Sequence, residues 1–409
     1  MLLNLLKNTK KNHLIAISLI AFFPLLVFFG SGIINLTIIF LDFIFLYELY
    51  RVKRLDYLKN KFFYLLLFLW LILLINLFFN INFNNSFSRS FGFCRFIFFA
   101  FALKFYIFDE HKDYKKYIFS IWTVIFLIIS LDLIFEFIFG KNILGFESYM
   151  PGRLSGFFNQ ELKIGYIYSF LSLVILTFLY LKFKHYKINT NFIYIIFFII
   201  LFISFIIGER ANFIKTFLMF FFFLFLFEKK FFKIKLTLIS VFCAVFVSII
   251  TFSENNNYKH RFWGTFLKPI INNPTGYLQN SSYADHYYAA YNVFKNYKFF
   301  GVGLKNYRIE VSSGNYGKNT STHPHEKHLE LLSETGLLGY FSFTSFFIFS
   351  IINGIRLFLN NKNLYQLSGL LFITTNLIPL IPSGSLFTTY TGTLFWFSFA
   401  FMIYSSKKN

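Results

Sequence analysis

Three histidines lie within six residues near the end of a long polar segment, at His323, His325 and His328. A neutral imidazole accepts a proton near pH 7, and this property suits a histidine to general base catalysis. His325 follows Pro324, a residue that favours the first position of a helix, so we expect His325 in the first turn of a short helix. The free backbone N–H groups of such a helix start would also favour an anion nearby.

The predicted helix has Thr322 or His323 as its cap and ends at Gly336, where an apolar run follows. Close histidines also suggest a metal site. However, no well-spaced carboxylate completes a ligand set, and the two cysteines, Cys94 and Cys243, lie inside apolar runs. We therefore expect neither a metal ion nor another cofactor.

Two arginines lie in short segments that are expected to face outward from a membrane. Arg153 follows a Pro-Gly pair, and Arg210 follows Gly208 and Glu209 in a short turn. An arginine suits a phosphate because its planar group makes two charge-assisted hydrogen bonds and stays ionised. The pair therefore indicates an anionic headgroup or a pyrophosphate as ligand. The alternatives are an ordinary ion pair with Glu209 or snorkelling to the headgroups, which alone explains Arg89.

These residues belong to a chain of 409 residues, of which 56% are hydrophobic and 14% are charged. A soluble domain has about 45–50% apolar and about 25% charged residues. The composition therefore argues against a soluble protein and predicts an all-α polytopic membrane protein. Phe, Ile, Asn and Lys are in excess along the whole chain, so no single Phe indicates a mechanism.

A membrane-spanning helix needs about 20 mostly apolar residues, and about twelve stretches qualify. They lie near residues 14–29, 33–49, 62–79, 91–108, 118–139, 164–181, 191–207, 212–227, 236–252, 336–358, 364–381 and 388–405. We expect transmembrane helices one to nine in residues 1–252 and a long extracytoplasmic loop with short helices in 253–335, between helices nine and ten. Helices ten to twelve follow in 336–409. Within the loop, residues 283–297 are expected to form a helix.

The formal net charge of +21 follows the alternation of the loops. One set of loops and termini holds 22 basic residues, whereas the short loops on the other side hold five: Arg89, Lys141, Arg153, Lys163 and Arg210. Because basic residues concentrate in cytoplasmic loops, both termini are expected in the cytoplasm. The charge then reflects orientation and indicates no nucleic-acid partner. Asp132 and Glu136 share one helix face within a span, where structural pairing is favoured over a proton relay.

The order of motifs resembles the signature of the O-antigen ligase and polymerase superfamily. The resemblance rests on Gly301-Val302-Gly303-Leu304-Lys305-Asn306-Tyr307, His323-Pro324-His325, and Leu329, Glu334, Gly336 and Gly339, together with the segments around Arg153 and Arg210. Two positions depart from the family pattern. Glu326 follows the motif histidine where Asn is usual, and Asp285 or His286 stands where an Arg often occurs.

The resemblance implies a metal-independent, inverting transfer of a glycan from undecaprenyl pyrophosphate to an acceptor sugar hydroxyl, such as that of the lipid A core. The reaction would take place on the periplasmic face of a bacterial inner membrane, among membrane lipids. By this analogy His325 takes the acceptor proton, while Arg210 and Arg153 bind the departing pyrophosphate. The possible supporting residues are His323, Glu326, Arg89 and Glu334.

Two alternatives remain open. An O-antigen polymerase would extend the carrier-linked glycan instead, and the same motifs fit that activity. A transporter or flippase of lipid-linked sugar would also use many spans and outward arginines. Such a transporter is expected to show an internal repeat and matching broken helices, which are not apparent in this sequence.

Overall fold

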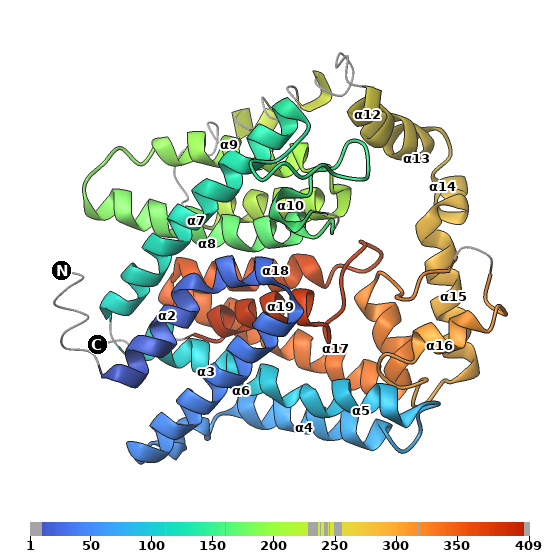
Figure 1. The fold of residues 1–409 in the computed structure, drawn as a ribbon, viewed down its shortest axis with the longest axis horizontal. Helices are drawn as coiled ribbons and strands as arrows, with labels where there is room; N and C mark the ends of the chain where they lie inside the picture. Colours follow the sequence, from blue (N-terminus) through green and yellow to red (C-terminus); the bar gives the residue numbers. More distant parts are fainter. Residues whose placement is uncertain are drawn as a thin grey trace. The chain divides into compact units, whose positions relative to one another are not determined.

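The computed structural model describes residues 10–110, 112–159, 161–227, 256–317 and 320–404, with single residues and short pieces between 236 and 248. Helices account for all the regular secondary structure in these residues (Figure 1). The chain forms two compact units. The first contains Met1–Ile118, Gln279–Asn361 and Asn376–Asn409, and the second contains Phe119–Leu278 and Lys362–Thr375.

Among the described residues, six helices are long and apolar enough to cross a membrane, which supports the predicted all-helical membrane protein. They are Lys11–Phe29, Ser31–Arg51, Phe83–Asp109, Asp113–Phe139, Ile164–His185 and Lys327–Asn361. Shorter apolar helices occupy Lys61–Asn76 and Phe192–Ile206. A helix also covers most of every other predicted stretch, apart from 236–252, which lies largely outside the described residues.

The first unit is a bundle of apolar helices joined to a group of short ones. Its bundle contains α2 (Lys11–Leu26), α3 (Ser31–Arg51), α4 (Lys61–Asn76), α5 (Phe83–Gly92), α6 (Cys94–Lys104), α17 (Lys327–Asn361) and α19 (Thr389–Met402). Helix α6 packs against both α3 and α19, and α17 packs against α4. Two further helices, α15 (Ser282–Asn296) and α16 (Tyr307–Ser312), pack against each other, and α15 also packs against α17. The predicted helix at 283–297 is therefore confirmed as α15.

The second unit holds the remaining apolar helices. It contains most of α7 (Lys112–Phe139) together with α8 (Ile164–His185), α9 (Phe192–Ile206), α10 (Arg210–Phe227) and most of α18 (Leu364–Asn376). Helices α8, α9 and α10 pack against one another. A wide helical turn, η5 (Lys259–Leu267), continues into the short helix α13 (Lys268–Asn272).

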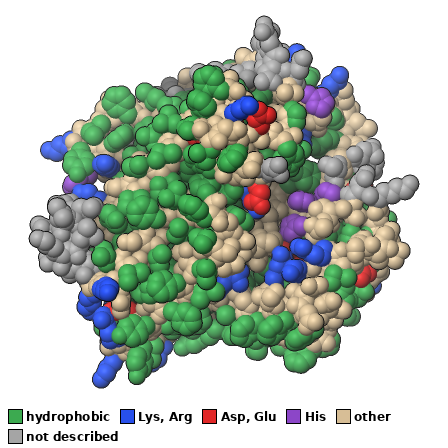
Figure 2. Space-filling view, in the orientation of Figure 1, with side chains coloured by type: hydrophobic (Ala, Val, Ile, Leu, Met, Phe, Trp, Pro, Cys, Tyr) green, Lys and Arg blue, Asp and Glu red, His purple; other side chains and the backbone are tan. Residues whose placement is uncertain are grey.

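Helix α3 shows why these helices suit a bilayer. One face is buried in the protein, and the opposite face exposes large apolar side chains at helical spacing, as expected when lipid covers that face. The buried face contains Ile34, Ile38, Leu41, Phe45 and Leu49, and the exposed face contains Leu36, Phe40, Phe43, Tyr47 and Tyr50. Figure 2 shows hydrophobic side chains over much of the drawn surface.

Candidate functional site

The helix that follows the histidines begins later than the sequence indicated. Helix α17 starts at Lys327, and Glu326 is its cap: the Glu326 Oε2 accepts the Leu329 N–H at 2.8 Å. His325 has a φ of 57°, a left-handed conformation that a helix does not accommodate. The expectation that His325 lies in the first helical turn, with Thr322 or His323 as cap, was therefore wrong. Glu326 supplies a carboxylate at the helix start, where the free N–H groups favour negative charge.

The end of this helical piece was predicted correctly. Gly336 has a φ of 63° and a ψ of −165°, so α17 breaks there and continues beyond it as the spanning part. A Cβ atom on Gly336 would lie 2.4 Å from the carbonyl carbon of Phe299, so the position has no room for a side chain. Across the break, the Leu337 N–H donates to the Lys298 carbonyl at 2.8 Å.

The turn Gly301-Val302-Gly303 caps the end of the short helical piece before Gly336. The Val302 N–H donates to the Ser333 carbonyl at 3.0 Å, and the Gly303 N–H donates to the Glu334 carbonyl at 2.9 Å. Both carbonyls belong to the last helical turn, where no helical N–H remains to pair with them. Gly301 has a φ of 67°, and a Cβ there would lie 2.5 Å from the Glu334 carbonyl carbon. Gly301-Val302-Gly303 therefore forms a turn against the end of this helical piece.

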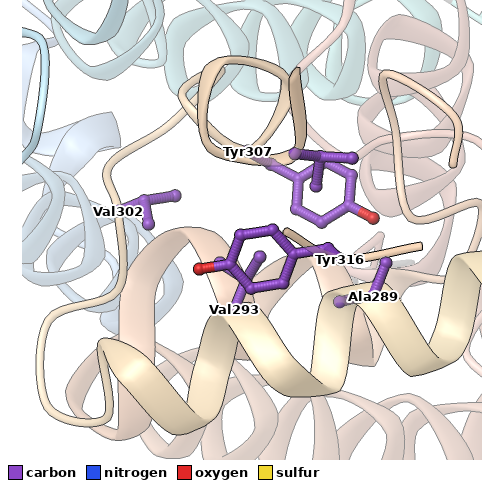
Figure 3. Close-up of a cluster of buried hydrophobic side chains, with 7 residues drawn as sticks. Ala289, Val293, Val302, Tyr307 and Tyr316 are labelled. Carbon is purple, nitrogen blue, oxygen red and sulfur yellow. The ribbon is translucent and has the colours of Figure 1, made fainter. Parts of the chain in front are cut away.

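A small apolar core joins α15, the Gly-x-Gly turn and α16 (Figure 3). Its buried members are Ala289, Ala290, Val293, Val302, Tyr307, Val311 and Tyr316, and Tyr297 and Leu329 pack against them. Leu329 belongs to the first turn of α17, so the core fixes the start of that helix against α15. The segment that carries the histidines therefore precedes a helix start that is packed on an apolar base.

Three polar contacts hold His325. Its Nε2 lies 3.0 Å from the Ser321 Oγ, its N–H donates to the His323 Nδ1 at 2.8 Å, and its carbonyl accepts the Ser383 N–H at 2.7 Å. The ring of His286, on α15, lies with its centroid 5.2 Å from that of His325. The ring of His325 therefore lies between its own segment and α15, and the Ser383 N–H holds its backbone.

The surroundings keep His325 neutral. Burial lowers the pKa of His325 to about 4, and the neighbouring His323 and His286 act in the same direction. Burial also lowers the pKa of His286, and the carboxylate of Asp285 opposes that shift. At neutral pH the His325 ring therefore carries no charge and has a nitrogen lone pair that can take a proton.

The other two supporting residues lie close to the same segment. Glu334 is buried, and the Lys305 N–H donates a hydrogen bond to its carboxylate, which ties α17 to the Gly-x-Gly turn. Arg89 lies in the last turn of α5, and its charge acts electrostatically on the carboxylates of Glu330 and Glu334. Both residues thus interact with the first part of α17, which follows the histidines. Sequence reasoning missed Glu330 altogether.

The two outward arginines come together through a close contact of two glycine turns. A Cβ on Gly208 would lie 2.0 Å from the Gly152 carbonyl oxygen, and the Leu154 N–H donates to the Ile207 carbonyl at 3.0 Å. Gly208 has a φ of 76°, which favours glycine. The turns that carry Arg153 and Arg210 therefore abut, and Gly208 cannot be replaced without displacing the turn that contains Gly152.

The guanidinium groups in these turns have different partners. The Arg153 Nη2 forms an ion pair with the Glu209 Oε1 at 2.8 Å, so the ion-pair alternative holds for Glu209. The Arg210 Nη1 lies 3.3 Å from the Thr265 Oγ1, and its guanidinium carbon lies 5.4 Å from the centre of the Phe266 ring. Arg210 is thus only loosely hydrogen-bonded and lies against an aromatic face.

A third arginine, Arg261 of η5, joins them, and sequence reasoning missed it. Its Nη2 donates to the Gly208 carbonyl at 3.0 Å, and its own carbonyl accepts from the Arg210 Nη1 at 3.4 Å. In the arginine cluster, Arg153, Arg210 and Arg261, the Arg153 guanidinium is paired with the Glu209 carboxylate. The only sequence signal is a basic residue among aromatic ones in His260-Arg261-Phe262-Trp263.

The buried carboxylates of α7 hold the connection that carries Arg153. The Glu136 carboxylate accepts the N–H groups of Ser155 at 2.9 Å and Gly156 at 2.8 Å. The Asp132 Oδ1 accepts the Ile143 N–H at 2.9 Å. These bonds support the structural reading of the pair rather than a proton relay.

The candidate site residues that were predicted from the sequence thus form two groups, one in each compact unit. His325, His323, Glu326, Glu334 and Arg89 belong to the first unit, and Arg153 and Arg210 belong to the second. Among the residues that the structure describes, no group of three or more His, Cys, Asp or Glu side chains is arranged to hold a metal ion.

Comparison with known proteins gives one family match. Residues 195–344 match the family model described as O-antigen ligase. The match begins in α9 and ends within α17, so it includes Arg210, Arg261, the Gly-x-Gly turn and the histidines, but not Arg153 or Arg89. No curated protein matches the chain. Residues 195–344 are therefore similar to the O-antigen ligase family, which supports the superfamily predicted from the sequence and a membrane enzyme of the ligase or polymerase type.

Proposed function

We propose that the chain is an O-antigen ligase-type glycosyltransferase. It would move a glycan from undecaprenyl pyrophosphate to a sugar hydroxyl of the lipid A core, without a metal ion or other cofactor. The observation that carries the proposal is the neutral imidazole of His325, a residue that three polar contacts hold, one through its ring and two through its backbone. The family match supports the reaction class.

In the proposed reaction, the acceptor hydroxyl loses its proton to His325 as its oxygen bonds to the anomeric carbon. The bond from that carbon to the pyrophosphate oxygen breaks, and the electron pair leaves with the pyrophosphate. Arg153 and Arg210 would bind the charge that develops there, and Arg261 would add a third guanidinium. One displacement inverts the anomeric configuration. The base and the arginine cluster belong to different units, so the two roles are proposed and tested separately.

The finer membrane arrangement is part of the same proposal. We propose twelve spans in a bacterial inner membrane, with both termini in the cytoplasm and the histidines on the periplasmic side. Residues 253–335 would form the periplasmic loop between helices nine and ten, with residues 1–252 and 336–409 on either side. The six long apolar helices and the basic-residue asymmetry support this arrangement.

The test uses the purified full chain in lipid vesicles, with a lipid-linked glycan and a core acceptor. His325→Ala should lower kcat by about 10²–10⁴-fold, the usual contribution of a general base, and leave the KM for the donor nearly unchanged. Arg210→Ala, Arg153→Ala and Arg261→Ala should raise the KM for the donor as well as lower kcat. His185→Ala, at the end of α8, is a matched histidine control. Full transfer by a folded His325→Ala protein would refute the role of His325.

Glycolipid from a strain that lacks the protein separates the related functions. Carrier-linked polymer that builds up without core-linked polymer indicates a ligase. Core that carries single repeat units indicates a polymerase. Carrier-linked units confined to the inner leaflet would indicate a flippase and contradict the proposal.

A further inference from the structure

Glu330 is a completely buried carboxylate that has no role in the proposed reaction. It lies one turn into α17, and its Oε1 lies 3.2 Å from the His323 Nε2. Its Oε2 accepts the Leu386 N–H at 3.2 Å, and Ser385 also hydrogen-bonds to it. A buried carboxylate is costly unless donors surround it, so these contacts fix its position.

The contacts of His323 determine its protonation pattern. Its Nδ1 accepts the His325 N–H at 2.8 Å, so Nδ1 carries no proton. The proton of the neutral ring is then on Nε2, where it points to the Glu330 carboxylate. Both nitrogens of His323 are therefore engaged within the protein, and His323 is not available to deprotonate an acceptor.

The same contact constrains the backbone of His325. A residue other than glycine at a φ of 57° is strained by about 1 kcal/mol, and a hydrogen bond from its own N–H helps to offset that cost. Backbone conformation sets the direction of a side chain, and here it directs the ring toward Ser321 and His286. Loss of the Nδ1 acceptor would free the backbone of His325 to take another conformation.

The connection between α18 and α19 secures the network from the other side. It donates the Ser383 N–H to the His325 carbonyl at 2.7 Å and the Leu386 N–H to Glu330 at 3.2 Å. It also accepts from His328 through the Leu377 carbonyl at 2.8 Å. The histidine segment is thus held at both its backbone and its buried carboxylate.

We propose that Glu330 and His323 are positioning residues: Glu330 fixes the ring of His323, whose Nδ1 holds the backbone of His325 in the conformation that aims its imidazole. This inference rests on the proposed function, because it assigns the two residues to the base of that reaction. Neither Glu330 nor His323 touches the substrate in this arrangement.

Two substitutions of His323 separate its two contacts. His323→Asn places an amide oxygen near the position of Nδ1, so it keeps the acceptor for the His325 N–H and loses the contact with Glu330. His323→Gln reaches toward Glu330 with an amide donor but has no acceptor at the δ position. We expect His323→Gln to lower kcat about 100-fold with an unchanged KM, because a base displaced by about 1 Å loses that much, and His323→Asn to retain most of the rate. His328→Gln, which keeps a donor for the Leu377 carbonyl, is the matched control.

Equal rates in the two His323 variants would overturn the proposal, as would a change confined to KM. A second measurement does not depend on activity. In the wild-type chain with 15N-labelled histidine at pH 7, the His323 ring should be in the Nε2–H tautomer, and Glu330→Gln, which removes the charge of the acceptor, should weaken that preference. An Nδ1–H tautomer in the wild type would refute the inference. If His325→Ala retained transfer, the proposed function would fail, whereas the tautomer would still test the positioning.

Discussion

The histidine segment, residues 321–326, and the two arginine turns, residues 150–156 and 207–212, are held in place by different means. The histidine segment depends on hydrogen bonds from distant parts of the chain, such as the Ser383 N–H to the His325 carbonyl at 2.7 Å. The arginine turns depend on close backbone contact, with no space for a Cβ between Gly208 and Gly152. One region is directed by polar contacts, and the other is fixed by packing.

The two regions also differ in charge. His325 is held neutral by burial and by two other imidazoles, as a proton acceptor must be. The arginine cluster brings three permanent cations together beside the carboxylate of Glu209, as suits an anion. In the proposed reaction, this difference would suit each region to one half of the group transfer, the proton or the leaving group.

The largest expected effect tests whether close packing holds the arginine turns. Gly208→Ala should destabilise the chain by about 3 kcal/mol or more, because it adds left-handed strain and a severe overlap with the Gly152 carbonyl. Gly140→Ala is the matched control, since Gly140 has the same φ of 76° and no atom within 4 Å of its Cβ position. The control should lose only about 1 kcal/mol. Thermal unfolding in detergent measures both, and equal losses would break the comparison.

A smaller effect concerns the dependence of stability on pH. The pKa of His325 is about 4 in the folded chain and about 6.5 when unfolded, so the unfolded state binds more protons between these values. Stability is therefore fully present above pH 6.5 and is lost as the pH falls toward 4. His325→Gln should remove about 2 kcal/mol of the loss seen at pH 5, and His286 should account for a further part.

The arginine turns provide a control for this pH dependence, because a guanidinium does not titrate between pH 5 and pH 7.5. Arg210→Gln should therefore show the same change in unfolding temperature between pH 7.5 and pH 5 as the wild type. The comparison fails if Arg210→Gln and His325→Gln alter the pH dependence equally. Transfer activity should follow the same sign, since the basic form of His325 is lost only as the pH falls through about 4.

The smallest effect concerns the cap of α17. Glu326→Ala removes the acceptor for the Leu329 N–H and should cost about 1 kcal/mol. Glu326→Asn should cost less than about 0.5 kcal/mol, since Asn is among the best capping residues. Unfolding midpoints measure both changes. An Asn variant as unstable as the Ala variant would show that Glu326 acts through something other than the cap.

Residue type and local spacing were sufficient for several parts of this picture. The break at Gly336, helix α15 and the turn at Gly301–Gly303 all follow from local preferences and are present. The membrane class followed from composition. The start of α17 was misplaced because Pro324 and Glu326 both fit a helix start, and only the left-handed φ of His325 decides between them.

The contacts that complete each region could not be predicted because they join residues far apart in the chain. Arg261 reaches Arg210 across 51 residues, and Glu330 meets Leu386 across 56. Neither pair has a local pattern, and neither residue type is unusual for its segment. Their meeting depends on how helices pack, which the spacing of residues along one helix does not determine.

The capping of α17 by the Gly-x-Gly turn has a consequence for how the sequence can change. The turn contacts Ser333 and Glu334 through backbone atoms, so most neighbouring side chains can be exchanged while the glycines remain. A chain with 68 phenylalanines has undergone strong compositional bias. Backbone hydrogen bonds do not depend on side-chain identity. The histidines can therefore keep their positions while the exposed apolar residues are substituted.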